Sequence, residues 1–243
     1  MSDITILVGS LDRYSAAWAP FCHGVRKYWP DCPWSIYFIT NELAAPCGES
    51  LKVGGDRDWS TNTRRALECI QAPVILFMLE EYWLYEQPNT GALMEFGDIV
   101  VRGEADHVRL VSSWSKKVRE KGVYEPDPRL CVFADDSVYR ATTQAGFWNR
   151  DVFLALIEPN ETIWDFENKG SIRSQRYGDR FLCVAEHRYI HYVLNTKDST
   201  YRSPYASSAI RKGKWSDAAR KYARDERLEI DFSRDPGDTK GVP

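Results

Sequence analysis

The segment VILFMLEEYWLY, residues 74–85, joins an uninterrupted apolar run to two adjacent carboxylates. A strand that is covered on both faces shows no polar alternation, so residues 74–79 predict a buried strand. Glu80 and Glu81 follow it directly, and aromatic residues come next. In open α/β sheets, ligands bind beyond the carboxyl ends of the strands, which is where this acidic pair would lie. A strand also becomes polar simply where it reaches water, so a functional and a structural interpretation are both open.

The sequence before this segment alternates between strand and helix patterns. Apolar residues at helical spacing cover residues 18–29, and Pro20 fits the first turn of that helix. The expected order is strand 4–10, helix 18–29, strand 34–40, a connection that reaches residue 60, helix 61–72 and strand 74–79. This alternation predicts an α/β fold with an open mixed, mostly parallel sheet flanked by helices.

The second half of the chain is less regular. We expect strands within 107–114 and 130–142, a helix over 149–157, a polar loop or helix over 163–174, a hairpin over 179–195 and a helix over 215–228. Residues 234–243 have the composition of a frayed tail. No internal repeat or low-complexity linker divides the sequence, so we expect a single domain.

Composition limits the functional classes. The 243 residues are 43% hydrophobic, which excludes a disordered chain. A net charge of −3 gives no general attraction to nucleic acid, so local groups must meet any anionic ligand. No leader segment and no apolar run near the ~18 residues of a membrane span is visible, and we expect a soluble, cytoplasmic protein. The six cysteines include no CxxC pair and the four histidines are scattered, so we expect reduced thiols rather than disulfides or a zinc site.

Four blocks of the chain, 4–42, 55–84, 139–171 and 209–215, resemble bacterial glycosyltransferase-like proteins associated with surface-polysaccharide genes. The resemblance implies a nucleotide-sugar-binding GT-A fold over residues 1–232, with a donor half of about 1–110, an acceptor half of about 111–232 and a flexible tail, 233–243. The implied activity is transfer of a sugar from a nucleoside diphosphate sugar to a saccharide or lipid-linked acceptor. A catalytically inactive nucleotide-sugar-binding protein and a nucleotidyltransferase remain alternatives, although the segment GSLDRYS after the first strand is a poor phosphate loop.

On the donor side, the resemblance implies contacts from Asp12, Arg13, Asp56, Asp58, Trp59, Arg64, Glu80 and Glu81. Glu80 and Glu81 take the place of the Asp-X-Asp motif of GT-A enzymes. Mn²⁺ or Mg²⁺ held there would stabilise the diphosphate leaving group as a Lewis acid. Adjacent residues of an extended strand point to opposite faces, so we expect one ligand and one structural partner. Without a metal, the positive charge would come from Arg13, Arg57, Arg64 or Arg65.

On the acceptor side, the resemblance implies a base and an aromatic platform. An inverting transfer needs a carboxylate that accepts the acceptor's hydroxyl proton. We assign this role to Glu167, with Asp165 in reserve, and a solvated acidic turn is the structural alternative. Asp135 and Asp136 form a weaker competing pair. The predicted sugar platform consists of Trp148, Trp164 and Tyr139.

The basic run IRKGKW, residues 210–215, precedes a helix that carries Arg220, Lys221 and Arg224. Such runs are usually solvated helix faces. The functional alternative is a contact with a diphosphate or with an anionic lipid surface that carries the acceptor, which would make the protein a peripheral membrane partner.

Overall fold

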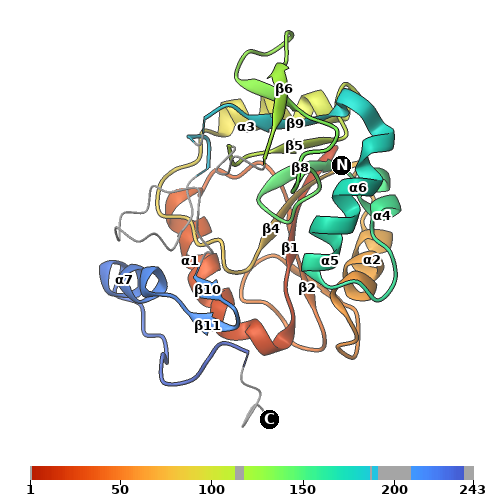
Figure 1. The fold of residues 1–243 in the computed structure, drawn as a ribbon. Helices are drawn as coiled ribbons and strands as arrows, with labels where there is room; N and C mark the ends of the chain where they lie inside the picture. Colours follow the sequence, from red (N-terminus) through yellow and green to blue (C-terminus); the bar gives the residue numbers. More distant parts are fainter. Residues whose placement is uncertain (1, 113–117, 187, 191–208, 238–243) are drawn as a thin grey trace.

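The computed structural model describes residues 2–112, 118–186, 188–190 and 209–237. Within these ranges, one nine-stranded sheet runs in the order β3-β2-β1-β4-β8-β5-β9-β7-β6, and β10 and β11 form a separate hairpin (Figure 1). No helix among the described residues is long and apolar enough to cross a membrane. The nine-stranded sheet and the helices that follow its strands make the fold mixed α/β, as predicted.

The N-terminal half of the sheet is entirely parallel and follows the predicted order, except that β3 lies in the segment expected to be a connection. Its strands are β1 (Ile4–Gly9), β2 (Ile36–Thr40), β3 (Glu49–Lys52) and β4 (Val74–Leu79). Helix α1 (Trp18–Tyr28) follows β1 after the 3₁₀ turn Asp12–Ala17, and α2 (Trp59–Cys69) connects β3 to β4. Pro20 lies in the first turn of α1, where its missing N–H leaves no hydrogen bond unmade.

Beyond β4 the sheet becomes mixed, because β8 pairs antiparallel with both β4 and β5. The strands there are β5 (His107–Arg109), β6 (Glu120–Val123), β7 (Leu130–Phe133), β8 (Gly146–Asn149) and β9 (Phe181–Val184). The helices are α3 (Thr90–Val101), α4 (Arg150–Leu156), α5 (Ile163–Asp165), the π turn Phe166–Gly170, α6 (Ser171–Ser174) and the 3₁₀ turn Gln175–Arg180. The hairpin β10 (Ile210–Arg211) and β11 (Lys214–Trp215) leads into α7 (Asp217–Glu226).

Both faces of the central strands are buried, which explains the apolar run in β4. Ile6 and Leu76 lie in the cluster that packs against α1 and α3. Leu7, Ile75 and Phe77 lie in the cluster on the other face, with residues of α2 and α4. Alternate residues of a strand thus reach two different cores, and no polar alternation is needed.

Three expectations were incomplete. Helix α3 was not predicted, because Gly91 and Gly97 interrupt its helical pattern. Gly97 packs closely against β1, since a Cβ there would lie 2.5 Å from the Cδ1 atom of Ile4 and would displace that side chain. The expected hairpin 179–195 contains β9, but most of its second strand lies outside the described residues. Residues 238–243 of the expected tail also lie outside them.

Helix α7 packs against the segment that follows β4. Its face carries Tyr222, whose hydroxyl donates to the Leu84 carbonyl at 2.9 Å. The Trp83 ring packs against the rings of Tyr222 and Trp215 in tilted arrangements, with centroid distances of 5.4 and 5.7 Å. At the helix end, the Glu226 carboxylate receives hydrogen bonds from α1, including one of 2.6 Å from Lys27. The C-terminal helix is therefore attached to the same strand end that carries the two glutamates.

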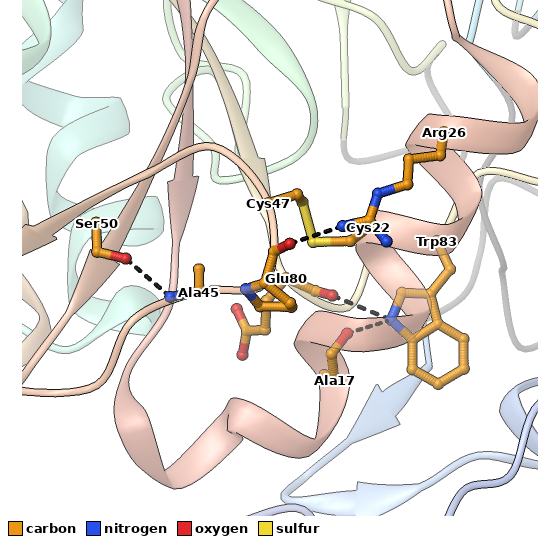
Figure 2. The surroundings of a disulfide bond; sticks show 9 residues. Ala17, Cys22, Arg26, Ala45, Cys47, Ser50, Glu80 and Trp83 are labelled. Carbon is orange, nitrogen blue, oxygen red and sulfur yellow. Dashed lines mark hydrogen bonds between the residues drawn. A yellow bond between two sulfur atoms is a disulfide. The ribbon is translucent and has the colours of Figure 1, made fainter.

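The prediction that all cysteines are reduced is wrong for one pair. Cys22 of α1 and Cys47 of the β2–β3 loop form a disulfide across 25 residues, with their Cα atoms 5.8 Å apart (Figure 2). Spacing in the sequence carried no sign of this pair, because only the fold brings the loop onto α1. Arg26 strengthens the contact by donating to the Pro46 carbonyl at 2.6 Å. Cys32, Cys69, Cys131 and Cys183 are free thiols.

We expect Cys47→Ser to lower the free energy of unfolding by about 3 kcal/mol, because the crosslink restricts the unfolded chain. In a chain of this size that corresponds to a Tm decrease of roughly 6–12 °C in calorimetry. Cys69→Ser, at an exposed free thiol, is the control and should leave Tm unchanged. Titration of the denatured, unreduced protein should count four thiols; a count of six would contradict the disulfide.

Candidate active site

A pocket of about 490 Å³ opens at the carboxyl ends of β1 and β4. The two strands end side by side, since Gly9 is paired with Leu79 in the parallel register. The pocket is lined by Gly9, Ser10, Leu11, Arg13, Tyr14, Trp59, Leu79, Glu80, Glu81, Ile163, Trp164, Ile210, Arg211, Lys212 and Gly213. Five separate parts of the chain therefore meet there: the β1 end, the start of α2, the β4 end, α5 and the β10–β11 hairpin.

The turn after β4 directs both glutamates into this pocket. The Tyr82 N–H donates to the Leu79 carbonyl at 3.0 Å, so the chain turns immediately after the strand. The Trp83 indole N–H donates to the carbonyls of Glu80 and Ala17, both at 3.1 Å, as Figure 2 shows. Only one glutamate was expected to face the crevice, on the assumption that the strand continued. The strand ends at Leu79, and both line the pocket.

The two carboxylates differ in their surroundings. Glu80 is only 6% exposed, and burial raises its pKa well above the usual range, with the neighbouring Glu81 charge adding to the shift. Arg13 acts in the opposite direction. Glu81 is half-buried, and its Oε2 atom accepts the Ile210 N–H at 3.1 Å. Glu80 is therefore the buried acid of the pocket, and Glu81 holds the hairpin.

The carboxylate pair suits a hard divalent cation. Among the described residues no group of three or more His, Cys, Asp and Glu side chains is placed to hold a metal alone. Mg²⁺ sites in transferases commonly use one or two carboxylates and complete their coordination with water and substrate phosphate. A cation beside Glu80 would also relieve the like-charge repulsion from Glu81. The donor set fits Mg²⁺ or Mn²⁺ in the presence of a phosphate ligand.

Two tryptophans, Trp59 and Trp164, line the pocket. Trp164 is the second residue of α5, which begins after a capping box between Thr162 and Asp165, and it is 65% exposed. Trp59 is the first residue of α2, and its ring lies 5.1 Å from that of Phe166. Trp59 therefore has structural support, while Trp164 presents an open aromatic face at the pocket.

Two residues that were predicted to contact the sugar donor instead stabilise the backbone around the site. The Asp12 carboxylate accepts three backbone N–H groups of the β2–β3 loop, from Asn41, Glu42 and Leu43, at 2.8–2.9 Å. Asp58 caps α2 by accepting the Thr61 N–H at 2.8 Å. Neither residue lines the pocket, and both carboxylates accept backbone hydrogen bonds instead. Asx residues commonly take such capping roles because their short side chains reach nearby backbone amides.

The predicted arginines also divide into two groups. Arg13 lines the pocket and pairs with Asp56 at 3.3 Å, an exposed ion pair in which Asp56 serves as a neighbour rather than a lining residue. Arg64 donates to the carbonyls of Leu154 and Ile157 at 2.9 and 2.8 Å, which ties α2 to the end of α4. Arg64 does not line the pocket, and its guanidinium connects two helices instead.

The predicted base, Glu167, lies outside the pocket. Its Oε1 atom accepts hydrogen bonds at 2.9 Å from the Thr142 hydroxyl and from both the N–H and hydroxyl of Thr143. Burial raises the Glu167 pKa, while these hydrogen bonds oppose the shift. A carboxylate used in this way stabilises the turn at 142–143, and its assignment as the catalytic base is corrected.

The reserve acids are also engaged elsewhere. Asp165 does not line the pocket, and hydrogen bonds from Lys169 and Thr162 lower its pKa to about 2, which makes it a weak base. Asp135 and Asp136 pair with cations outside the pocket, including Lys121 at 3.0 Å from Asp135.

Of the predicted aromatic platform, only Trp164 lies at the pocket. Trp148 is fully buried in β8, where its ring stacks on His107 at 3.7 Å and on Phe153 at 4.7 Å. It has no face available to a sugar, so that assignment is wrong. Tyr139 packs beside the core on the same side of the sheet and does not line the pocket.

The sequence indicates the hairpin residues as part of a basic run, with contact to a diphosphate or an anionic lipid surface as the functional alternative. Arg211 and Lys212 line the pocket although about 130 residues separate them from Glu80 and Glu81 in the sequence. The Lys-Gly pair between charged residues is a turn signal, but nothing local indicates which surface the turn covers. The packing of Trp215 against Trp83 and the hydrogen bonds from Ala209 and Ile210 to Glu81 place it there.

No protein-family model matches the chain, and no curated protein matches its sequence. Among solved structures, the bifunctional IspDF from Campylobacter jejuni aligns with 79% of this chain at a TM-score of 0.46 and 10% identity, and the chain spans 52% of its length. S. aureus TarS 1-349 in complex with UDP-GlcNAc aligns with 77% of this chain at a TM-score of 0.48 and 9% identity, and the alignment covers 57% of the TarS chain. A cytidylyltransferase from Leptospira borgpetersenii aligns with 74% of this chain at a TM-score of 0.44 and 7% identity, and the alignment covers 74% of its own chain. With similarity at this level, the functional assignment rests on the pocket itself.

The raised pKa of Glu80 makes stability depend on pH in a defined direction. The stability of the protonated form is fully present below the unfolded pKa of about 4.3 and is lost as pH rises through the higher folded pKa. Glu80→Gln removes this titration. In EDTA, we expect the variant to melt above the wild type at pH 8 and together with it at pH 4, measured by calorimetry.

Added Mn²⁺ should stabilise the wild type at pH 8 more than Glu80→Gln, because a cation favours the ionised carboxylate. Glu49→Gln, at an exposed residue of β3, is the control and should show no such difference. Equal pH dependence of the wild type and Glu80→Gln would contradict the assignment of Glu80 as the buried acid.

Proposed function

We propose that the protein is a transferase that binds a nucleoside diphosphate sugar in the pocket and transfers the sugar to a saccharide or lipid-linked acceptor. One observation supports this most strongly. At the carboxyl ends of parallel strands, the adjacent acids Glu80 and Glu81 share a pocket with Arg13, Arg211 and Lys212. Acids with nearby cations at such a location suit a metal and a diphosphate together.

Different residues of the pocket have different roles in donor binding. Arg13 and the hairpin cations attract the diphosphate and neutralise the charge that develops on it when the sugar leaves. Glu80 would hold Mg²⁺ or Mn²⁺, which supplies Lewis-acid stabilisation of the same leaving group. The buried setting of Glu80 strengthens its electrostatic interactions because little water screens them.

The acceptor would approach from the side of Trp164. An exposed indole offers a flat apolar surface on which the apolar face of a pyranose can stack. Because Glu167 serves the 142–143 turn, the proposal assigns no catalytic base and no stereochemical course.

A nucleotidyltransferase is the second candidate, since a strand-end acid pair with cations also suits transfer of a nucleotidyl group. Incubation with Mn²⁺ and a panel of nucleoside diphosphate sugars separates the candidates. Release of nucleoside diphosphate supports the proposal, whereas binding without turnover identifies a binding protein. Release of pyrophosphate from a nucleoside triphosphate and a sugar phosphate identifies the nucleotidyltransferase. If none of these ligands binds at millimolar concentration, the proposal is wrong.

For the donor, we expect Arg13→Gln to weaken UDP or GDP binding about tenfold in calorimetry, because a charge-assisted hydrogen bond to phosphate is lost. The Arg13–Asp56 pair is exposed, so its loss should leave the fold intact. Arg57→Gln changes a neighbouring arginine outside the pocket and is the matched control. Equal effects of the two substitutions would contradict the role of Arg13.

For the acceptor, we expect Trp164→Ala to reduce transfer about tenfold relative to donor hydrolysis by water, because the stacking surface is lost. Donor affinity should remain unchanged. Ile172→Ala, at an equally exposed residue outside the pocket, should leave the ratio unchanged. A parallel loss of transfer and hydrolysis in Trp164→Ala would show that the residue acts on the donor instead.

A further inference from the structure

The tip of the β10–β11 hairpin has an unusual backbone for its sequence. Lys212 and Gly213 both have positive φ angles, 50° and 75°. They are the central residues of a two-residue hairpin loop, because Arg211 pairs with Lys214. This combination is typical of a type I′ turn, which favours Asn or Asp followed by Gly. Gly213 fits the rule, whereas Lys212 occupies a left-handed position that lysine rarely adopts.

The strained residue is also the one that lines the pocket. Arg211, Lys212 and Gly213 are pocket residues, while Lys214, one step further along the hairpin, is not. Backbone strain tends to persist where the side chain has a function to perform. The tip therefore presents two cations to the side of the pocket that carries Glu80 and Glu81.

Glu81 attaches the hairpin through two separate contacts. Its backbone carbonyl accepts the Ala209 N–H at 3.2 Å, and its side-chain Oε2 accepts the Ile210 N–H at 3.1 Å. On the other strand, Trp215 packs against Trp83, which fixes the turn that carries Glu81. The position of the tip relative to the pocket thus depends on the Glu81 side chain.

We propose that Arg211 and Lys212 form a diphosphate-binding clamp and that Glu81 is its positioning residue rather than a metal ligand. This inference rests on the proposed function and makes it more specific, because it assigns the hairpin to the diphosphate and leaves Glu80 as the residue for the cation. It also separates two neighbouring glutamates that would otherwise be expected to act alike. The clamp should bind diphosphate more tightly than monophosphate, since two cations can contact both phosphates.

The cation test uses metal-free calorimetry in EDTA with inorganic pyrophosphate and inorganic phosphate as probes. Lys212→Asn improves the fit of the turn but removes the cation. We expect pyrophosphate to bind about tenfold more weakly, with Tm unchanged or raised. Lys214→Asn removes a cation from the same hairpin outside the pocket and should change affinity less than about twofold. Equal effects of the two substitutions, or no pyrophosphate binding to the wild type at millimolar concentration, would overturn the clamp.

The positioning test compares two substitutions of Glu81 in the same assay. Glu81→Gln keeps a carbonyl oxygen that can accept the Ile210 N–H, whereas Glu81→Ala does not. Both remove the negative charge, so their difference reports the hydrogen bond. We expect Glu81→Gln to bind pyrophosphate at least as tightly as the wild type and Glu81→Ala to bind about tenfold more weakly than Glu81→Gln. Equal affinities of the two variants would overturn the positioning role.

Mn²⁺ binding provides the remaining comparison. If Glu81 positions the hairpin, Glu81→Gln retains Mn²⁺-dependent stabilisation and Glu80→Gln loses it; the reverse pattern would make Glu81 the metal ligand and overturn the assignment. The outcome is independent of turnover. If the pyrophosphate affinities agree with the clamp but the protein turns over no nucleotide sugar, the proposed function alone is contradicted. If the protein turns over a nucleotide sugar but the hairpin substitutions do not change pyrophosphate affinity, the clamp alone is contradicted.

Discussion

The site depends on how β4 ends. One buried indole N–H, that of Trp83, is shared between the carbonyls of Ala17 and Glu80. It links the turn after β4 to the start of α1, and without it both buried carbonyls would lose a partner, at a cost of about 1–3 kcal/mol for each group left unsatisfied. The same ring packs against Trp215 at the base of the hairpin. The turn that carries the acids and the base of the basic hairpin therefore both contact this one side chain.

The parts of the fold that local patterns determine could be predicted from the sequence. Strands β1 and β4 are read from continuous apolar runs, and α1 from its helical stripe, because each pattern reports burial on elements next to one another in the chain. The strand-end rule then located Glu80, Glu81 and Arg13 at the pocket. The rule works because the chain order of a parallel sheet fixes which loops share an edge.

Residues whose type suits two roles could not be assigned in this way. Asp12 and Asp58 accept backbone amides, and Arg64 donates to backbone carbonyls, although the same groups would serve equally well to contact a nucleotide. Glu167 shows the same ambiguity, since its partners at 142–143 are about 25 residues away. The Cys22–Cys47 bond and the docking of the hairpin are also long-range contacts. Composition and spacing describe a residue's chemistry, but only tertiary packing decides which partner uses it.

The charges in the pocket indicate that a cation and a diphosphate would bind together rather than independently. Glu80 and Glu81 repel one another, and this repulsion contributes to the raised pKa of Glu80. Arg13, Arg211 and Lys212 lie around the same pocket. A diphosphate alone would be attracted by the basic side chains but repelled by the acidic ones. A divalent cation alone would be repelled by the basic side chains. Bound together, each neutralises the charge that opposes the other, so the affinity of either ligand should rise when the other is present, and by the same factor in both directions. The presence of both acidic and basic side chains in one pocket thus favours a metal–diphosphate pair over either ion alone.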